Sequence, residues 1–143
     1  PVLNNWVGKQ ADSIRFERSH IVWNRSTKEH ARLFFSTRAL GMDDALHEDI
    51  FNEIHKLRNT LLTQNDQLEY LASKGVTKEQ AEKTLNSFNT DSQLRKAEAL
   101  QRSIRVPSIP ALVINGRYLV SGENLSSTTE MLAVAEFLLQ QQE

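Results

Sequence analysis

The sequence predicts an α/β domain in which a helix and a strand precede a long block of helices, and a β-hairpin and a last helix follow it. Three observations predict this order. Asn115-Gly116 separates two short apolar runs, which is the strongest short-range signal of a hairpin. Residues 13–23 alternate apolar and charged side chains before becoming apolar, which is typical of a strand. Between residues 24 and 105 only helical periodicity is found, interrupted by helix-capping patterns.

The first ten residues predict a helix. Val2, Leu3, Trp6 and Val7 recur at helical spacing, and Pro1 suits a first turn, where its missing N–H is not needed. We expect this helix to pack Trp6 into a core. Because the sequence begins with proline rather than methionine and shows no signal peptide, we expect a processed, truncated or incompletely recorded chain.

Residues 13–23, SIRFERSHIVW, predict a strand that is half exposed at first and more buried at its end. Ile14 and Phe16 alternate with charged neighbours, and the apolar run Ile21–Trp23 follows. His20 lies within this stretch, and we expect a packed histidine rather than a metal ligand.

The central block predicts several amphipathic helices. Two of them are expected to begin at capping boxes, Ser26–Glu29 and Thr77–Gln80. The others are expected to begin at Asp43 or Asp44, at Thr63 or Asn65, and at Asn89–Ser92. A third capping box, Ser127–Glu130, opens the last helix, which follows the hairpin. Gly41 and Gly75 are expected to end two of these helices, because glycine readily adopts a left-handed conformation. Each helix has one apolar face, so the set must pack on itself and on the strands.

The histidines do not form a recognised metal pattern. His47, Glu48 and His55 lack the His-Glu-x-x-His spacing of zinc proteases, and His30 stands apart in sequence. We expect these histidines to be surface or packing residues, and we predict no metal site and no cofactor.

The hairpin is entered through a proline-rich bend. The residues that precede Pro107 and Pro110 are pushed toward extended geometry. On spacing alone we expect both X-Pro bonds to be trans, because only about 5–6% of such bonds in folded proteins are cis. Asn115-Gly116 predicts a two-residue type I′ turn, which requires positive φ at both residues.

Composition excludes several classes of function. The net charge is −1 with both signs mixed along the chain, so no basic patch for nucleic acid is present. No apolar run approaches the ~20 residues that a membrane span needs. The cysteine count is zero, which excludes disulfides, thiolate metal sites and thiol nucleophiles within these residues.

Ser108-Ile109-Pro110, followed by Ala-Leu-Val-Ile-Asn-Gly-Arg-Tyr, resembles the cis-proline loop and hairpin of thioredoxin-fold proteins. It is most similar to the DsbA family of bacterial periplasmic dithiol oxidases, whose hairpin reads Val-Pro-x-x-x-Val-Asn-Gly-Lys-Tyr. In that family the cis-proline faces the redox disulfide, and the residue before it binds the substrate backbone. The resemblance implies that Pro110 is the cis-proline and that Ser108, Ile109 and Pro110 bind substrate. Pro107 has no counterpart in the pattern.

The resemblance also implies a thioredoxin-like (DsbA-like) fold with an all-helical insertion. Residues 1–24 and 105–143 would form the thioredoxin-like part and residues 25–104 the insertion. The first strand and the start of the first helix, which carries Cys-x-x-Cys, would be absent. Arg18 would be a basic charge near the redox site.

The absent strand would lie between the predicted strand at Ile14–Val22 and the strand at Ala111–Ile114. Its loss would leave unpaired N–H and C=O groups that each cost about 1–3 kcal/mol, against a total stability of ~5–15 kcal/mol. We therefore expect that these residues alone do not form a stable monomer of ordinary thioredoxin topology. Missing residues fill the gap, a second chain fills it in a swapped dimer, or the strands rearrange.

The family resemblance implies a periplasmic thiol:disulfide oxidoreductase that introduces disulfides into exported proteins, with unfolded or reduced polypeptides as substrates and a membrane redox protein as a partner. Because the chain has no cysteine, it holds no catalytic residue of that reaction. Three interpretations follow. We favour the larger part of an oxidase whose motif lies just upstream of Pro1. The others are a cysteine-free relative that binds peptides or a partner, and a kappa-type glutathione transferase relative.

Overall fold

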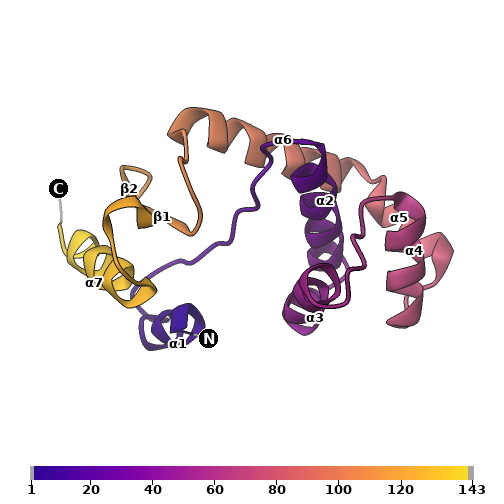
Figure 1. Ribbon diagram of the computed structural model, residues 1–143, viewed down its shortest axis with the longest axis horizontal. Helices are drawn as coiled ribbons and strands as arrows, with labels where there is room; N and C mark the ends of the chain where they lie inside the picture. The colour runs from indigo at the N-terminus through magenta and orange to yellow at the C-terminus, as the bar shows by residue number, and fades with distance from the viewer. Residues whose placement is uncertain (1, 142–143) are drawn as a thin grey trace. The chain divides into compact units, whose positions relative to one another are not determined.

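The computed structural model describes residues 2–141, which are mostly helical and include one small sheet (Figure 1). The chain divides into two compact units. One, here called the hairpin unit, comprises Pro1–Arg18 and Ser103–Glu143, and the other, the helical unit, comprises Ser19–Arg102. The helix predicted for the first ten residues is confirmed from Val2 to Lys9, while the prediction for Pro1 lies outside the described residues.

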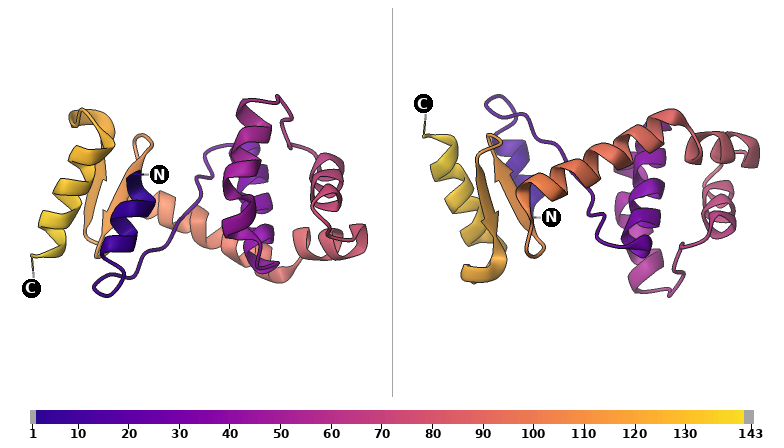
Figure 2. Two further views of the ribbon diagram at one scale, coloured as in Figure 1. Left: turned by 90° about the horizontal axis from the view of Figure 1, so that it is seen from below. Right: turned by 90° about the horizontal axis from the view of Figure 1, so that it is seen from above.

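The hairpin unit contains a two-stranded antiparallel sheet with helices against one face. Its elements are α1 (Val2–Lys9), β1 (Ala111–Ile114), β2 (Tyr118–Ser121), the 3-10 helix η1 (Gly122–Asn124) and α7 (Thr128–Leu139). Helix α7 packs against both strands and against α1, and Figure 2 shows it running alongside the hairpin. Ile114 and Val120 form the core with Met131 and Ala135 of α7, and Trp6 of α1 packs against them.

The turn of the hairpin has the predicted backbone but is one residue longer than predicted. Asn115 and Gly116 adopt φ values of 52° and 66°, and the Arg117 N–H donates to the Ile114 carbonyl at 3.0 Å. The register pairs Ile114 with Tyr118, so three residues connect the strands and the prediction of a two-residue loop is wrong. Arg117 occupies the additional position.

The helical unit is organised around α2 (Arg25–Ala39). The other helices are α3 (Asp43–His55), α4 (Gln64–Ser73), α5 (Lys78–Leu85) and α6 (Phe88–Ile104), whose last residues belong to the hairpin unit. Helix α2 packs against α3 and α5. Leu33 and Phe34 join the larger core with residues of α3, α4 and α5, while Ala31 and Phe35 pack against Leu94 and Ala97 of α6.

Of the six predicted helix starts, three are confirmed and two are wrong, while α6 begins at Phe88, one residue before the predicted start at Asn89–Ser92. The side chains of Thr63, Thr77 and Ser127 cap α4, α5 and α7. Helix α2 instead begins after Asn24, which forms a capping box with Thr27, because the Asn24 side chain reaches the Thr27 N–H at 3.0 Å. Helix α3 begins after Met42, whose side chain makes no capping bond, and so neither Asp43 nor Asp44 is the cap.

The strand predicted for residues 13–23 is absent, because no described strand lies beside it to form a ladder. The segment is extended, and its side chains alternate between partly buried and exposed from Ile14 to His20. Near the end of this segment, backbone N–H groups donate to side chains instead of to a neighbouring strand. The Val22 N–H donates to Gln101 Oε1 at 2.9 Å, and the Trp23 N–H donates to Thr27 Oγ1 at 2.9 Å. The rest of the predicted element order is confirmed.

Candidate functional site

The loop that contains Ser108, Ile109 and Pro110 connects α6 to β1. Helix α6 is followed by Arg105, whose φ of 52° turns the chain out of the helix. The peptide bond between Ile109 and Pro110 is cis, as the resemblance implied and the spacing alone did not. Pro110 directly precedes β1, so the hairpin core positions the loop.

The main chain of this loop is not hydrogen-bonded to other described residues. No hydrogen bond joins the backbone of Ser108, Ile109 or Pro110 to another part of the chain that the structure describes. The Ile109 side chain is 62% exposed, whereas Ser108 is half-buried. The loop therefore has an N–H and carbonyls that make no hydrogen bond with the described residues, and beside them an exposed apolar side chain.

Arg18 lies on a different segment, against the first turns of α1. Its Nη2 donates to Asn4 Oδ1 at 2.6 Å, and its guanidinium lies 5.4 Å from the centre of the Phe16 ring. Asn4 lies in the first described turn of α1. Arg18 therefore places a positive charge beside the first described turn of α1.

Trp6 supports the same unit from α1. It packs against the hairpin core, as the sequence predicts, but its indole N–H is buried and makes no hydrogen bond with any described residue. Sequence periodicity placed Trp6 in a core but could not show that its donor would lack an acceptor there.

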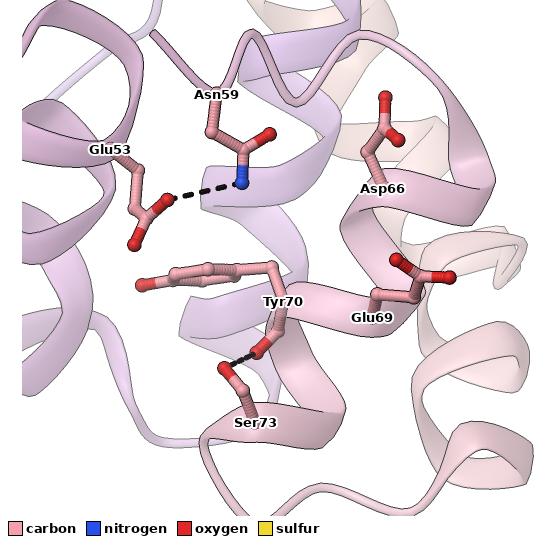
Figure 3. A pocket seen from close by; sticks show the side chains of 6 residues that line it. All are labelled: Glu53, Asn59, Asp66, Glu69, Tyr70 and Ser73. Carbon is pink, nitrogen blue, oxygen red and sulfur yellow. Dashed lines mark hydrogen bonds between the residues drawn. The ribbon is translucent and has the colours of Figure 1, made fainter. Parts of the chain in front are cut away.

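A pocket in the helical unit is a second place where side chains converge (Figure 3). It encloses about 230 Å³ and is lined by Glu53, Asn59, Asp66, Glu69, Tyr70 and Ser73. Asn59 Nδ2 donates to Glu53 Oε2 at 3.0 Å, and Ser73 Oγ donates to the Tyr70 carbonyl at 2.6 Å. No residue predicted for the site lines this pocket. The spacing of 66, 69, 70 and 73 on one helix face is a signal that could have found it.

Tyr70 connects this pocket to an ion pair between Asp49 of α3 and Lys74, which directly follows α4. Asp49 Oδ2 accepts hydrogen bonds from the Tyr70 hydroxyl at 2.7 Å and from Lys74 Nζ at 2.8 Å. These bonds, with Lys74 first and Tyr70 second, lower the pKa of Asp49. Burial raises the pKa of Tyr70, and the bond to Asp49 adds to that effect. The network stabilises a neutral tyrosine and an ionised aspartate.

The histidines pack against nearby side chains or make local contacts, as expected. His20 stacks on Phe34 with the ring centroids 4.5 Å apart, and His55 contacts the Phe51 ring. Among residues 2–141, no group of three or more His, Asp or Glu side chains could hold a metal ion. None of the described helices combines the length and apolar character that crossing a membrane requires.

Solved DsbA structures share the fold of this chain. Pseudomonas aeruginosa DsbA superposes with a TM-score of 0.85 at 26% identity, covering 97% of this chain and 74% of that one. Xylella fastidiosa DsbA gives 0.86 at 23% identity over 96% and 74%. A Proteus DsbA, solved with the non-covalently bound peptide PWATCDS, gives 0.79 at 22% identity over 96% and 76%.

Curated DsbA sequences are similar to this chain as well. The thiol:disulfide interchange protein DsbA of Azotobacter vinelandii is 31% identical over 142 residues, which cover 99% of this chain and 66% of that protein. The protein of the same name from Burkholderia cepacia is 30% identical over 141 residues, with the same coverage. The chain thus spans 66% of the length of these relatives. The sequence model of the DSBA-like thioredoxin domain matches residues 3–133, and the chain belongs to that family.

Proposed function

We propose that this chain is the polypeptide-binding part of a DsbA-like thiol:disulfide oxidoreductase, and that the redox cysteines come from outside these 143 residues. The observation that carries the proposal is the unbonded main chain at Ile109, beside an exposed apolar side chain. An extended peptide can bond such a segment through its own backbone, independently of its sequence. That property suits a protein that acts on many unfolded polypeptides.

The second support is electrostatic. Thiol–disulfide exchange proceeds when a substrate thiolate attacks one sulfur of the enzyme disulfide and displaces the other as a thiolate. A second substrate thiolate then releases the enzyme dithiol, so two electrons pass from substrate to enzyme. Arg18, which bonds Asn4 in the first described turn of α1, would add a positive charge that stabilises the leaving thiolate. Because this chain has no cysteine, it performs none of these steps alone.

The proposal includes two predictions from the family. The protein works in the bacterial periplasm, and a membrane redox protein re-oxidises its dithiol. Neither depends on the peptide-binding loop, so both can fail without affecting the proposed role of that loop.

Binding of a labelled PWATCDS peptide to the 143-residue chain, measured by fluorescence polarisation, tests the role of the loop. We expect Ile109→Asp to weaken binding at least ~10-fold, because the change adds a charge beside the backbone that the peptide bonds. Phe137→Asp is the matched control, since Phe137 is also 62% exposed in the hairpin unit but lies on α7.

Equal loss in both variants, or no loss in either, would contradict the proposal. Binding of glutathione by the chain, with no binding of the peptide, would also contradict it and would favour a glutathione transferase relative. Circular dichroism of each variant establishes that the comparison is made between folded proteins.

A further inference from the structure

Helix α6 pairs both of its carboxylates with α2. Glu98 accepts a hydrogen bond from Lys28 Nζ at 2.9 Å, and Asp91 accepts one from Arg32 Nη1 at 2.9 Å. Both cations lie on α2, and α6 has no other acidic residue. Charges of both signs are mixed along the sequence, but packing in the helical unit therefore leaves no unpaired acidic charge on α6.

The side of α6 opposite its packed side carries cations and no carboxylate. Thr90, Leu94 and Ala97 are the buried residues of the helix. With 3.6 residues per turn, positions 88, 92, 95, 99 and 102 form a stripe on the other side, which only Lys96 flanks with a further charge. We call this surface the outer α6 face, and its residues are Phe88, Ser92, Arg95, Lys96, Ala99 and Arg102.

The positive charges of the outer α6 face are not neutralised within the chain. Arg95, Lys96 and Arg102 form no ion pair with any residue that the structure describes, and all three are exposed. Phe88 is 81% exposed, and the Arg95 guanidinium lies 5.8 Å from the centre of its ring. The face therefore combines uncompensated positive charge with an aromatic ring in water.

This combination suits a membrane surface better than an acidic polypeptide. Cations of a folded protein attract the head groups of anionic lipids. An acidic polypeptide would satisfy the cations alone, whereas Phe88 gains where an apolar layer lies directly beneath the charges, as it does in a lipid leaflet. Because the residues of the face follow one side of a single helix, a flat surface can contact all of them at once.

We propose that the outer α6 face binds the surface of a membrane that contains anionic lipid, with α6 parallel to the plane of the bilayer. The cations contact the lipid head groups, and Phe88 enters the boundary between head groups and acyl chains. The contact involves one leaflet and no membrane-spanning segment. The inference does not rest on peptide binding, because Ile109 belongs to the hairpin unit and the outer α6 face to the helical unit.

Co-sedimentation of the whole chain with lipid vesicles tests the proposal. We expect binding to vesicles of phosphatidylcholine mixed with phosphatidylglycerol, and none to vesicles of phosphatidylcholine alone. Replacing the three cations together, by Arg95→Gln, Lys96→Gln and Arg102→Gln, should weaken the apparent affinity roughly 100-fold, since each cation contributes about 5-fold near such a surface. Binding of the parent chain should also weaken as the salt concentration rises from about 0.1 M to about 1 M, because salt screens the attraction.

The matched control removes the same amount of charge from other elements, by Lys9→Gln, Lys56→Gln and Lys78→Gln at three exposed lysines. It should bind anionic vesicles nearly as tightly as the parent chain. Phe88→Ser should weaken binding and leave its salt dependence unchanged. A parent chain that does not bind anionic vesicles, equal losses in the two triple variants, or equally tight binding of soluble poly-glutamate, which would indicate an acidic polypeptide as the partner, would each overturn the proposal.

Discussion

Ile109 is the residue on which the proposed function depends most. Its N–H and C=O make no hydrogen bond with the described residues, and its side chain is 62% exposed. Because these groups are solvated in the free protein, each bond to a peptide contributes only about 0.5–1.5 kcal/mol. Backbone pairing alone therefore gives weak, sequence-tolerant binding, and apolar contact with the Ile109 side chain must supply part of the affinity.

Asn24 and Ser26 allow a direct comparison of two candidate caps for α2. The Asn24 side chain accepts from the Thr27 N–H, whereas Ser26 lies inside the helix. We expect Asn24→Ala to lower the free energy of unfolding by about 1 kcal/mol, as loss of a cap usually does. Ser26→Ala should change it little. Urea denaturation measures both, and a larger loss in Ser26→Ala would show that the helix begins where the sequence pattern placed it.

Asp49 gives a prediction about pH. Its bonds from Lys74 and Tyr70 lower its pKa in the folded state, so the ionised form stabilises the fold. That stability is present above the ordinary aspartate pKa of about 3.9 and is lost as pH falls through the lower folded value. Asp49→Asn should therefore destabilise the chain near neutral pH, by no more than ~1 kcal/mol because the pair is partly exposed.

The difference between Asp49→Asn and the parent should shrink in denaturation curves recorded below about pH 4. Glu48→Gln, an exposed neighbour on α3, is the control and should show no such trend. A difference that stays constant from neutral pH down to pH 3, roughly one unit below the ordinary value, would contradict the assigned network.

At the scale of elements, the hairpin depends on a turn with left-handed backbone at Asn115 and Gly116. We expect Gly116→Ala to cost about 1–2 kcal/mol, because a Cβ at a φ of 66° is strained even where space is open. Gly122→Ala, at a glycine of η1 without positive φ, should be nearly neutral. Thermal unfolding measures both, and equal effects would argue against this turn.

Most helices and the hairpin could be predicted because their signals are local. The side chains of Thr63, Thr77 and Ser127 each accept a hydrogen bond from the backbone N–H three residues later in the chain. The Asn-Gly pair itself favours the turn that it forms. The family resemblance at Ser108–Pro110 could likewise be identified from adjacent residues.

The predictions that were wrong, and the features that the sequence did not reveal, depend on contacts between residues far apart in the chain. Residues 13–23 have the pattern of a strand, but a strand requires a neighbour, and the backbone of Val22 bonds the Gln101 side chain instead. The contact of Arg18 with Asn4 spans fourteen positions and leaves no local pattern. The pocket joins Glu53 of α3 to a face of α4, a pairing that only packing determines.

At the scale of the whole molecule, the chain combines a well-packed helical unit with a hairpin unit in which some hydrogen-bonding groups have no partner among the described residues. Leu33, Ile50, Leu71 and Leu85 are fully buried in the larger core. In the hairpin unit, the β1 edge and the Trp6 indole N–H remain without partners among the described residues. We therefore expect further polypeptide to associate with the hairpin unit rather than with the helical core.

The most direct test of the central claim is an NMR titration of the isotope-labelled chain with the peptide PWATCDS. The account predicts that the amide signals of Ile109 and Ala111 shift on binding and that exchange of the Ile109 amide slows, while signals of α4 and α5 stay in place. Shifts confined to the helical unit, or an Ile109 amide that exchanges equally fast with and without bound peptide, would contradict it.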